Sequence, residues 1–242
     1  MERFTRSEKT ILAAAVVLAA AAAVFVWTNF TRAFPEASLE FKVNRSTSQP
    51  VAESFLKQHV PEAAAQLAGS RRAAVFELDD GAKLYLEREL GLERLSALVS
   101  AREVRLWSWS HRWFRALQKE EVRVAVSPEG EVIGFAHLLP EETAGAGLEE
   151  AAARAVAERL LRAGFGLEAS ALRFIESKRE DRPARRDWTF TWERDGWRQG
   201  DATYRFSVEV HGDQPGAYRE FLKVPDAWTQ SYERLRAHNN TA

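Results

Sequence analysis

The longest apolar stretch of the chain lies near its N-terminus. Ile11 to Trp27 form an unbroken apolar run, and with Thr28 to Phe30 the segment gives about 30 Å of helix, just enough to cross a bilayer. The run exceeds the usual apolar region of a signal peptide, and it ends in large aromatic residues instead of a small-x-small cleavage site. We therefore expect a permanent membrane anchor. A cleaved signal peptide and a buried soluble helix are the alternatives.

Basic residues before this run predict its orientation. Arg3, Arg6 and Lys9 precede the apolar segment, and Arg32 follows it. Under the positive-inside rule this asymmetry keeps the N-terminus cytoplasmic and places the body of the protein outside the cytoplasm. The composition is rich in arginine, alanine and glutamate, which is typical of a GC-rich bacterial genome. We expect a single-pass protein of the bacterial inner (cytoplasmic) membrane, held there by Ile11 to Phe30.

The body of the chain carries one hydrophobic pattern twice. Residues 121–139 align with residues 203–223 at an offset of 82, and both stretches alternate apolar and polar positions around a glycine-bearing turn. Upstream, at an offset of 81, two aromatic pairs also align: Trp107 and Trp109 with Trp188 and Phe190. The nearly constant offset predicts an internal repeat, in which one structural unit is duplicated.

Each unit is predicted to be a helix followed by an antiparallel meander, which makes the fold α+β. In the second unit the helix covers about residues 148–163, and in the first it begins near Ser48. The first unit has an extra segment, strand-like at 73–78 and then helical over about 82–99. The predicted boundaries are 1–30 for the N-terminus and transmembrane helix, 31–47 for a linker, 48–142 and 147–228 for the two units, and 229–242 for a tail.

The stretch WSWSHRWF, residues 107–114, is the most aromatic part of the body. On a strand Trp107 and Trp109 share one face, and the intervening serines lie on the other. Burying one indole contributes a few kcal/mol, at about 25 cal/mol per Å², so we expect this stripe to face the core. The alternation breaks near the end of the stretch. We therefore place the candidate partner-binding residues there: Trp113 and Phe114, with His111 and Arg112 beside them.

Composition and charge exclude several classes of function. The formal net charge is −1 and the pI is about 6.6, so the chain lacks the basic surplus with which proteins neutralise nucleic-acid phosphates. It contains no cysteine, which excludes disulfides, thiolate metal sites and cysteine nucleophiles. We expect contacts with a membrane and with a peptide or membrane-protein partner, and none with nucleic acid.

The sequence carries no recognisable catalytic set. Its five histidines do not fall in HExxH spacing, and no GxSxG or phosphate-binding glycine loop is present. The run 177–187 mixes charges around Pro183 and reads as a solvated hairpin loop. We therefore expect no catalytic residue, no cofactor and no metal site in this chain.

Several segments carry a family resemblance. VNRSTSQPVAESFL (43–56), LYLERELGLERL (84–95), WSHRWFRALQKEEVRV (109–124), DWTFTWE (187–193) and YREFLKVPDAW (218–228) resemble the region that precedes the catalytic part in some bacterial CPBP-family proteins. These are intramembrane proteases related to CAAX prenyl endopeptidases. The helix-plus-meander unit is itself similar to PepSY-type extracytoplasmic modules.

The resemblance implies a regulatory or substrate-gating region without its catalytic bundle. The family's chemistry comes from EExxxR, FxxxH and a later histidine motif, all on transmembrane helices. Here EEAAAR (149–154) and FLKQH (55–59) stand in the reverse order on polar amphipathic helices, so we interpret them as surface features, with Arg154 pairing Glu150. A stand-alone anchored peptide-binding or protease-inhibitor module is the alternative, and an enzyme in its own right is the reading the sequence favours least.

Overall fold

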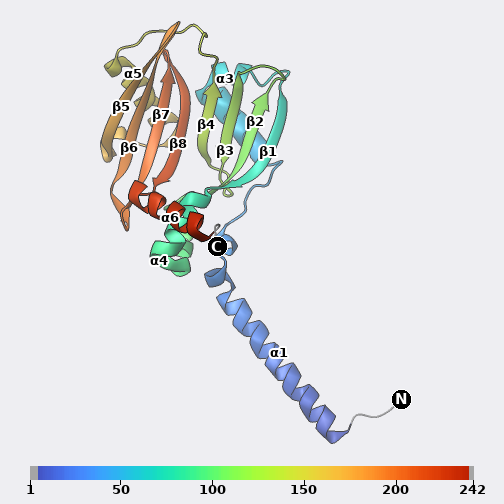
Figure 1. Cartoon of the computed structure of the whole chain (residues 1–242). Helices are drawn as coiled ribbons and strands as arrows, with labels where there is room; N and C mark the ends of the chain where they lie inside the picture. The colour runs from blue at the N-terminus through green and yellow to red at the C-terminus, as the bar shows by residue number, and fades with distance from the viewer. Residues whose placement is uncertain (1–4, 240–242) are drawn as a thin grey trace.

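The computed structural model describes residues 5–239, and the predicted orientation signal at Arg3 lies outside them. The chain begins with the helix α1, Arg6–Ala33, which projects away from the body (Figure 1). Thr5 and Glu8 close its first turn with a capping box. Residues 6–30 are long and apolar enough to cross a membrane, and none of the apolar window is buried against the body. A short 3-10 helix, η1 (Pro35–Ser38), then leads into the body.

The body is one continuous antiparallel sheet of eight strands, in the order β1-β2-β3-β4-β8-β7-β6-β5. The first four strands in the sequence form one half of the sheet and the last four form the other, and β4 and β8 join the halves side by side. The strands are β1 (Arg71–Leu78), β2 (Trp107–Phe114), β3 (Glu121–Val126), β4 (Val132–Leu138), β5 (Leu172–Arg182), β6 (Arg185–Gln199), β7 (Ala202–His211) and β8 (Gln214–Lys223).

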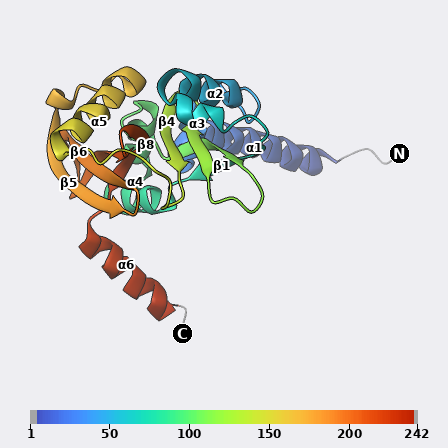
Figure 2. The ribbon, with the colours of Figure 1, turned by 90° about the horizontal axis from the view of Figure 1, so that it is seen from above.

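Three helices cover one face of this sheet. The helices α2 (Ser48–His59) and α3 (Pro61–Ala65) lie over the first half, and α5 (Glu150–Phe165) lies over the second (Figure 2). The buried side of α5 carries Ala153, Ala157 and Leu160 at helical spacing, and the helix ends at Gly166 in the left-handed conformation. The fold is therefore α+β, as the sequence predicts.

The large rings fill the space between the sheet and these helices. Trp107, Trp188 and Trp192 are 4%, 7% and 0% exposed, which confirms the prediction of a core-facing aromatic stripe. Trp109 is half-buried, and its indole Nε1 donates a hydrogen bond to the Val43 carbonyl, 3.3 Å away. Buried side chains of both halves belong to one hydrophobic core. The two predicted units therefore share a single core and a single sheet. Their common origin stays a prediction.

Several boundaries differ from the sequence prediction. The run 177–187 is not a solvated loop, because β5 and β6 extend through it and leave only a tight turn at 183–184. The strand at 73–78 belongs to β1, the edge strand of the first half, and β5 is the edge strand of the second half. Both halves therefore have this strand, and it is not an extra segment of the first unit. The helix predicted over 82–99 is α4, Asp80–Ser100, and Gly91 interrupts it with φ of 79°.

The predicted C-terminal tail also folds. Residues 226–239 form the helix α6 (Asp226–Asn239), which contacts α4 at the base of the sheet, the end from which α1 leaves (Figure 1). Trp228 packs edge-on against Tyr85, with ring centroids 5.1 Å apart, and its indole Nε1 donates to Glu89 at 2.7 Å. These contacts explain why the chain stays helical beyond its last strand.

Candidate functional site

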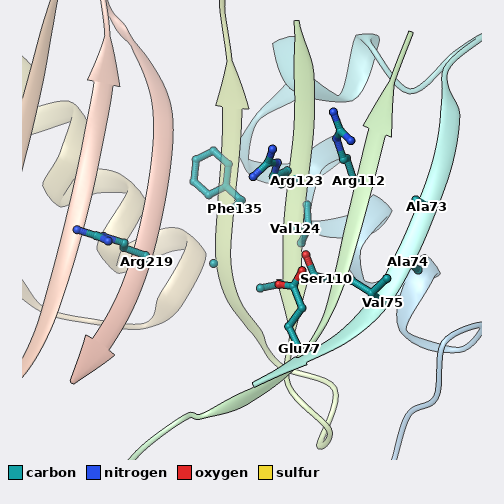
Figure 3. Close-up of a pocket in the computed structure, with 12 residues that line it drawn as sticks. Ala73, Ala74, Val75, Glu77, Ser110, Arg112, Arg123, Val124, Phe135 and Arg219 are labelled. Atoms are coloured by element: carbon teal, nitrogen blue, oxygen red, sulfur yellow. The ribbon is translucent and has the colours of Figure 1, made fainter. Parts of the chain in front are cut away.

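Within residues 5–239 no helix covers the face of the sheet opposite α2, α3 and α5, except at its base, and we call this face the open face (Figure 2). Over the first half of the sheet it is hollowed by about 830 Å³. Figure 3 shows this hollow, with Arg112 and Arg123 next to each other on neighbouring strands and Arg219 on β8. We define the hollow by six of its lining residues: Ser110, Arg112, Arg123, Ala125, Gly134 and Arg219.

Small side chains make the floor of the hollow. Ala125 on β3 faces Gly134 on β4 in register, and Ser110 on β2 pairs with the same alanine on the other side. An antiparallel sheet with one solvated face alternates apolar residues inward with polar residues outward. Here the outward positions of the first half combine short side chains with arginines at the rim, so the backbone of the strands lies close to solvent.

The rim of the hollow is charged. Glu121 accepts hydrogen bonds from the guanidinium Nε atoms of Arg112 at 2.6 Å and Arg123 at 2.7 Å. Burial raises the pKa of Glu121, but these two hydrogen bonds outweigh burial and hold the pKa below its ordinary value. Arg219 is exposed and lies over the Phe221 ring, 4.4 Å from its centroid. The hollow and its rim therefore present three guanidinium groups together with two carboxylates, the deeply held Glu121 and the exposed Glu77 of β1.

The four predicted partner-binding residues divide between the two faces. Trp113 and His111 are 4% and 0% exposed and stack with centroids 5.7 Å apart under α2, so neither offers a surface to a partner. The alternation of β2 continues to its last residue, so the expected break in the pattern at Trp113 is wrong. Arg112 and Phe114 lie on the open face, with the guanidinium 4.7 Å from the ring centroid. Their role in binding stays a prediction.

His111 also contacts a serine, in a pattern that superficially resembles a catalytic pair. Its Nε2 lies 2.9 Å from the Ser48 hydroxyl, and Arg72 Nη1 lies 3.4 Å from its Nδ1. Burial first, and the charge of Arg72 second, lower the pKa of His111. The Ser48 hydroxyl donates to the Asn44 carbonyl at 2.7 Å, and the serine is fully buried. These contacts fasten the start of α2 to the sheet.

A second, polar cavity of about 410 Å³ lies on the helix-covered face, where the two halves of the sheet meet. Glu220 of β8 lines it, with Tyr218 beside it and Arg105 and Arg194 facing it. Burial raises the pKa of Glu220 to about 7, against the opposing charges of the two arginines. Sequence reasoning missed this glutamate, because nothing in the local pattern of β8 distinguishes it from a solvated residue.

The two protease-like motifs lie on helices of the body: Glu149, Glu150 and Arg154 of EEAAAR make polar contacts, whereas Phe55 and Leu56 of FLKQH are buried in the core. Arg154 donates to Glu158 at 2.8 Å, and not to Glu150 as predicted, while Glu150 accepts a hydrogen bond from Ser177 at 2.7 Å. Glu149 pairs with Arg186 at 2.6 Å. Within residues 5–239 no group of three or more His, Cys, Asp or Glu side chains is arranged to hold a metal ion.

No protein-family model, curated protein or solved structure matches this chain. The resemblance to CPBP-family proteins and to PepSY-type modules therefore stays a prediction, and it rests on the segments quoted above.

Proposed function

We propose that this protein is a membrane-anchored binding module that holds a protein partner against the open face of its sheet. The observation that carries the proposal is the hollow, because it combines a floor of small side chains with arginines on three strands, including Arg219 from the second half. Side chains of a partner can approach such a floor closely, while the guanidinium groups supply hydrogen bonds and charge.

The apolar helix supports the anchoring part of the proposal. In the proposed topology α1 crosses the bacterial inner membrane with Arg6 and Lys9 on the cytoplasmic side. The sheet then stands outside the cytoplasm, close to the membrane surface, because α4 and η1 contact the end of α1. A partner embedded in the same membrane can reach the sheet without leaving the bilayer.

The family resemblance suggests the partner. On that basis we propose an intramembrane endopeptidase of the CPBP kind, whose substrate access the module regulates. A stand-alone module that binds or inhibits through a peptide is the second candidate, favoured by the free edge strand described below.

Site-directed photo-cross-linking in native membranes tests the proposal. A photoreactive amino acid at Ser110, in the hollow, is expected to cross-link to a membrane protein that bears the EExxxR and FxxxH motifs. The same amino acid at Thr189, on β6 and two strands beyond the last strand that lines the hollow, is the matched control and is expected to give no such product. Ala125→Trp, which fills the floor, is expected to abolish the cross-link. A product of equal yield from both positions, or one that persists in Ala125→Trp, would refute the proposed surface.

A further inference from the structure

The edge strand β1 is regular along its whole length. Its eight residues pair with β2 without a bulge, from Arg71 opposite Phe114 to Leu78 opposite Trp107. Among residues 5–239 no backbone hydrogen bond reaches the outer side of β1. Such an edge presents unpaired N–H and C=O groups, which a further strand can bond.

The other edge of the sheet is protected in a way that β1 is not. The strand β5 carries four consecutive charged residues, Lys178 to Asp181, and a bulge interrupts its pairing between Phe174 and Glu176. Charges and bulges at an edge discourage the addition of another strand. The middle of β1 is uncharged instead, and Val75 and Phe76 are 53% and 39% exposed. The two edges therefore differ in their readiness to pair.

The charged residues of β1 lie at its two ends, Arg71 and Arg72 at one and Glu77 at the other, and Arg72 contacts buried His111. Arg71, Ala73, Val75 and Glu77 share the open face, because strand residues alternate between faces and Ala73, Val75 and Glu77 all line the hollow. Within the described part of the chain neither Arg71 nor Glu77 has an ion-pair partner. An occupant of this edge can therefore supply a carboxylate at one end and a cation at the other.

We propose that the free edge of β1 binds an extended segment of a partner protein as an antiparallel ninth strand, with a basic residue opposite Glu77 and an acidic residue opposite Arg71. In this register two apolar residues of the segment face Val75 and Ala73 at the border of the hollow. The inference rests on the proposed function and deepens it, because it states the chemistry of the segment that the module holds.

A second copy of the chain is the competing occupant, since β1 itself has this charge pattern when it runs antiparallel to β1 of another copy. The helix α4 follows directly after Leu78 and contacts α1, so the anchor leaves from one end of β1 (Figure 1). Antiparallel pairing would place the two anchors at opposite ends of the joined strands. Two copies in one membrane cannot satisfy that geometry, and a segment of a partner can.

Labelled peptides test the inference on the full chain in detergent micelles, with fluorescence anisotropy as the readout. The peptide KTVTVTE places lysine opposite Glu77 and glutamate opposite Arg71 when it runs antiparallel. We expect it to bind about threefold or more tightly than KTVTVTK and ETVTVTK, because cross-strand charge pairs have about that effect. Preference of the unaltered chain for ETVTVTK would mean a parallel strand and would overturn the proposed orientation.

Variants of β1 locate the binding. The double variant Arg71→Glu, Glu77→Arg is expected to reverse the preference and select ETVTVTK. Val75→Lys is expected to weaken KTVTVTE binding, whereas Leu92→Lys, at an exposed apolar residue of α4, is the matched control and should leave it unchanged. Equal binding to Val75→Lys and to the unaltered chain would overturn the inference. So would a dimer of the unaltered chain that Val75→Lys dissociates, because the occupant would then be a second copy.

A negative result in the peptide assay and a negative result in the membrane cross-link lead to different conclusions. If the Ser110 cross-link forms but the peptides show no charge preference, the partner binds the open face without adding a strand. If the peptides bind as expected but no cross-link forms, the edge pairs with segments of a different partner and the proposed function is wrong.

Discussion

Replacing Glu220 with glutamine is expected to stabilise the protein at pH 8 and to change its stability little at pH 4. Glu220 is half-buried in the polar cavity on the helix-covered face, and its surroundings shift the pKa of its carboxyl group in two opposing directions. Arg105 and Arg194 favour the charged form, while burial and the nearby Glu131 disfavour it. Burial and Glu131 together have the larger effect, so the pKa rises from the ordinary value of 4.5 to about 7.

The sign of the effect follows from this direction. Between pH 4.5 and 7 the folded protein holds a proton on Glu220 that the unfolded chain releases. The stabilisation by Glu220 is therefore fully present below pH 4.5 and is lost as the pH rises to about 7. At about 1.4 kcal/mol for each pKa unit the loss is at most about 3 kcal/mol. Glu220 is half-buried, not fully enclosed, so we expect about 2 kcal/mol.

Urea unfolding of the full chain in detergent micelles measures this effect through tryptophan fluorescence. Glutamine has the shape of the protonated acid, so the difference in unfolding free energy between Glu220→Gln and the unaltered chain should grow from near zero at pH 4 to about 2 kcal/mol at pH 8. Glu142→Gln, at an exposed glutamate between β4 and α5, is the matched control and should show no such growth. A difference that is constant with pH, or a variant less stable at pH 8, would refute the reasoning.

Two further predictions concern contacts that fix the fold. Ser48→Ala removes the hydroxyl that contacts buried His111, and we expect a loss of about 1 to 3 kcal/mol in urea unfolding; a loss below a few tenths would contradict the role of that contact. Gly212 has φ of 66°, and an added Cβ would lie 2.9 Å from the Ala146 nitrogen. Gly212→Ala should therefore lower the melting temperature more than Gly69→Ala, which has φ of 74° and open space around it. Equal shifts would show that backbone conformation alone decides the cost.

Local patterns predicted a large part of this structure. The alternation around Trp107 and Trp188 placed both indoles correctly in the core, because a ring of that size contributes several kcal/mol when buried and one face of each strand had to hide it. The helix α5 was predicted within two residues at each end, since its apolar stripe and Gly166 are local features. The apolar run of α1 was equally clear.

Other parts depend on long-range contacts that no local pattern records. The strand β5 is rich in charge, and it is a strand because β6 supplies its hydrogen bonds, so the sequence indicated a loop. Trp113 was predicted as a candidate binding residue because the alternation was expected to break near the end of this stretch. The structure buries it because α2 covers that face of β2. The cavity around Glu220 also depends on long-range contacts, because its lining residues come from both halves of the chain, and so no local pattern predicts it.

The pairing of β4 with β8 joins the two halves of the sheet, and no pattern in the sequence predicts it. It consists of three paired residues, from Gly134 opposite Arg219 to Ala136 opposite Ala217. A Cβ at Gly134 would lie 3.3 Å from the Tyr218 carbonyl oxygen, so glycine allows this close approach. The join brings Arg219 from the second half to the rim of a hollow that the first half builds. The proposed binding surface therefore exists only because the two halves share one sheet, and neither half alone would present all three guanidinium groups to a partner.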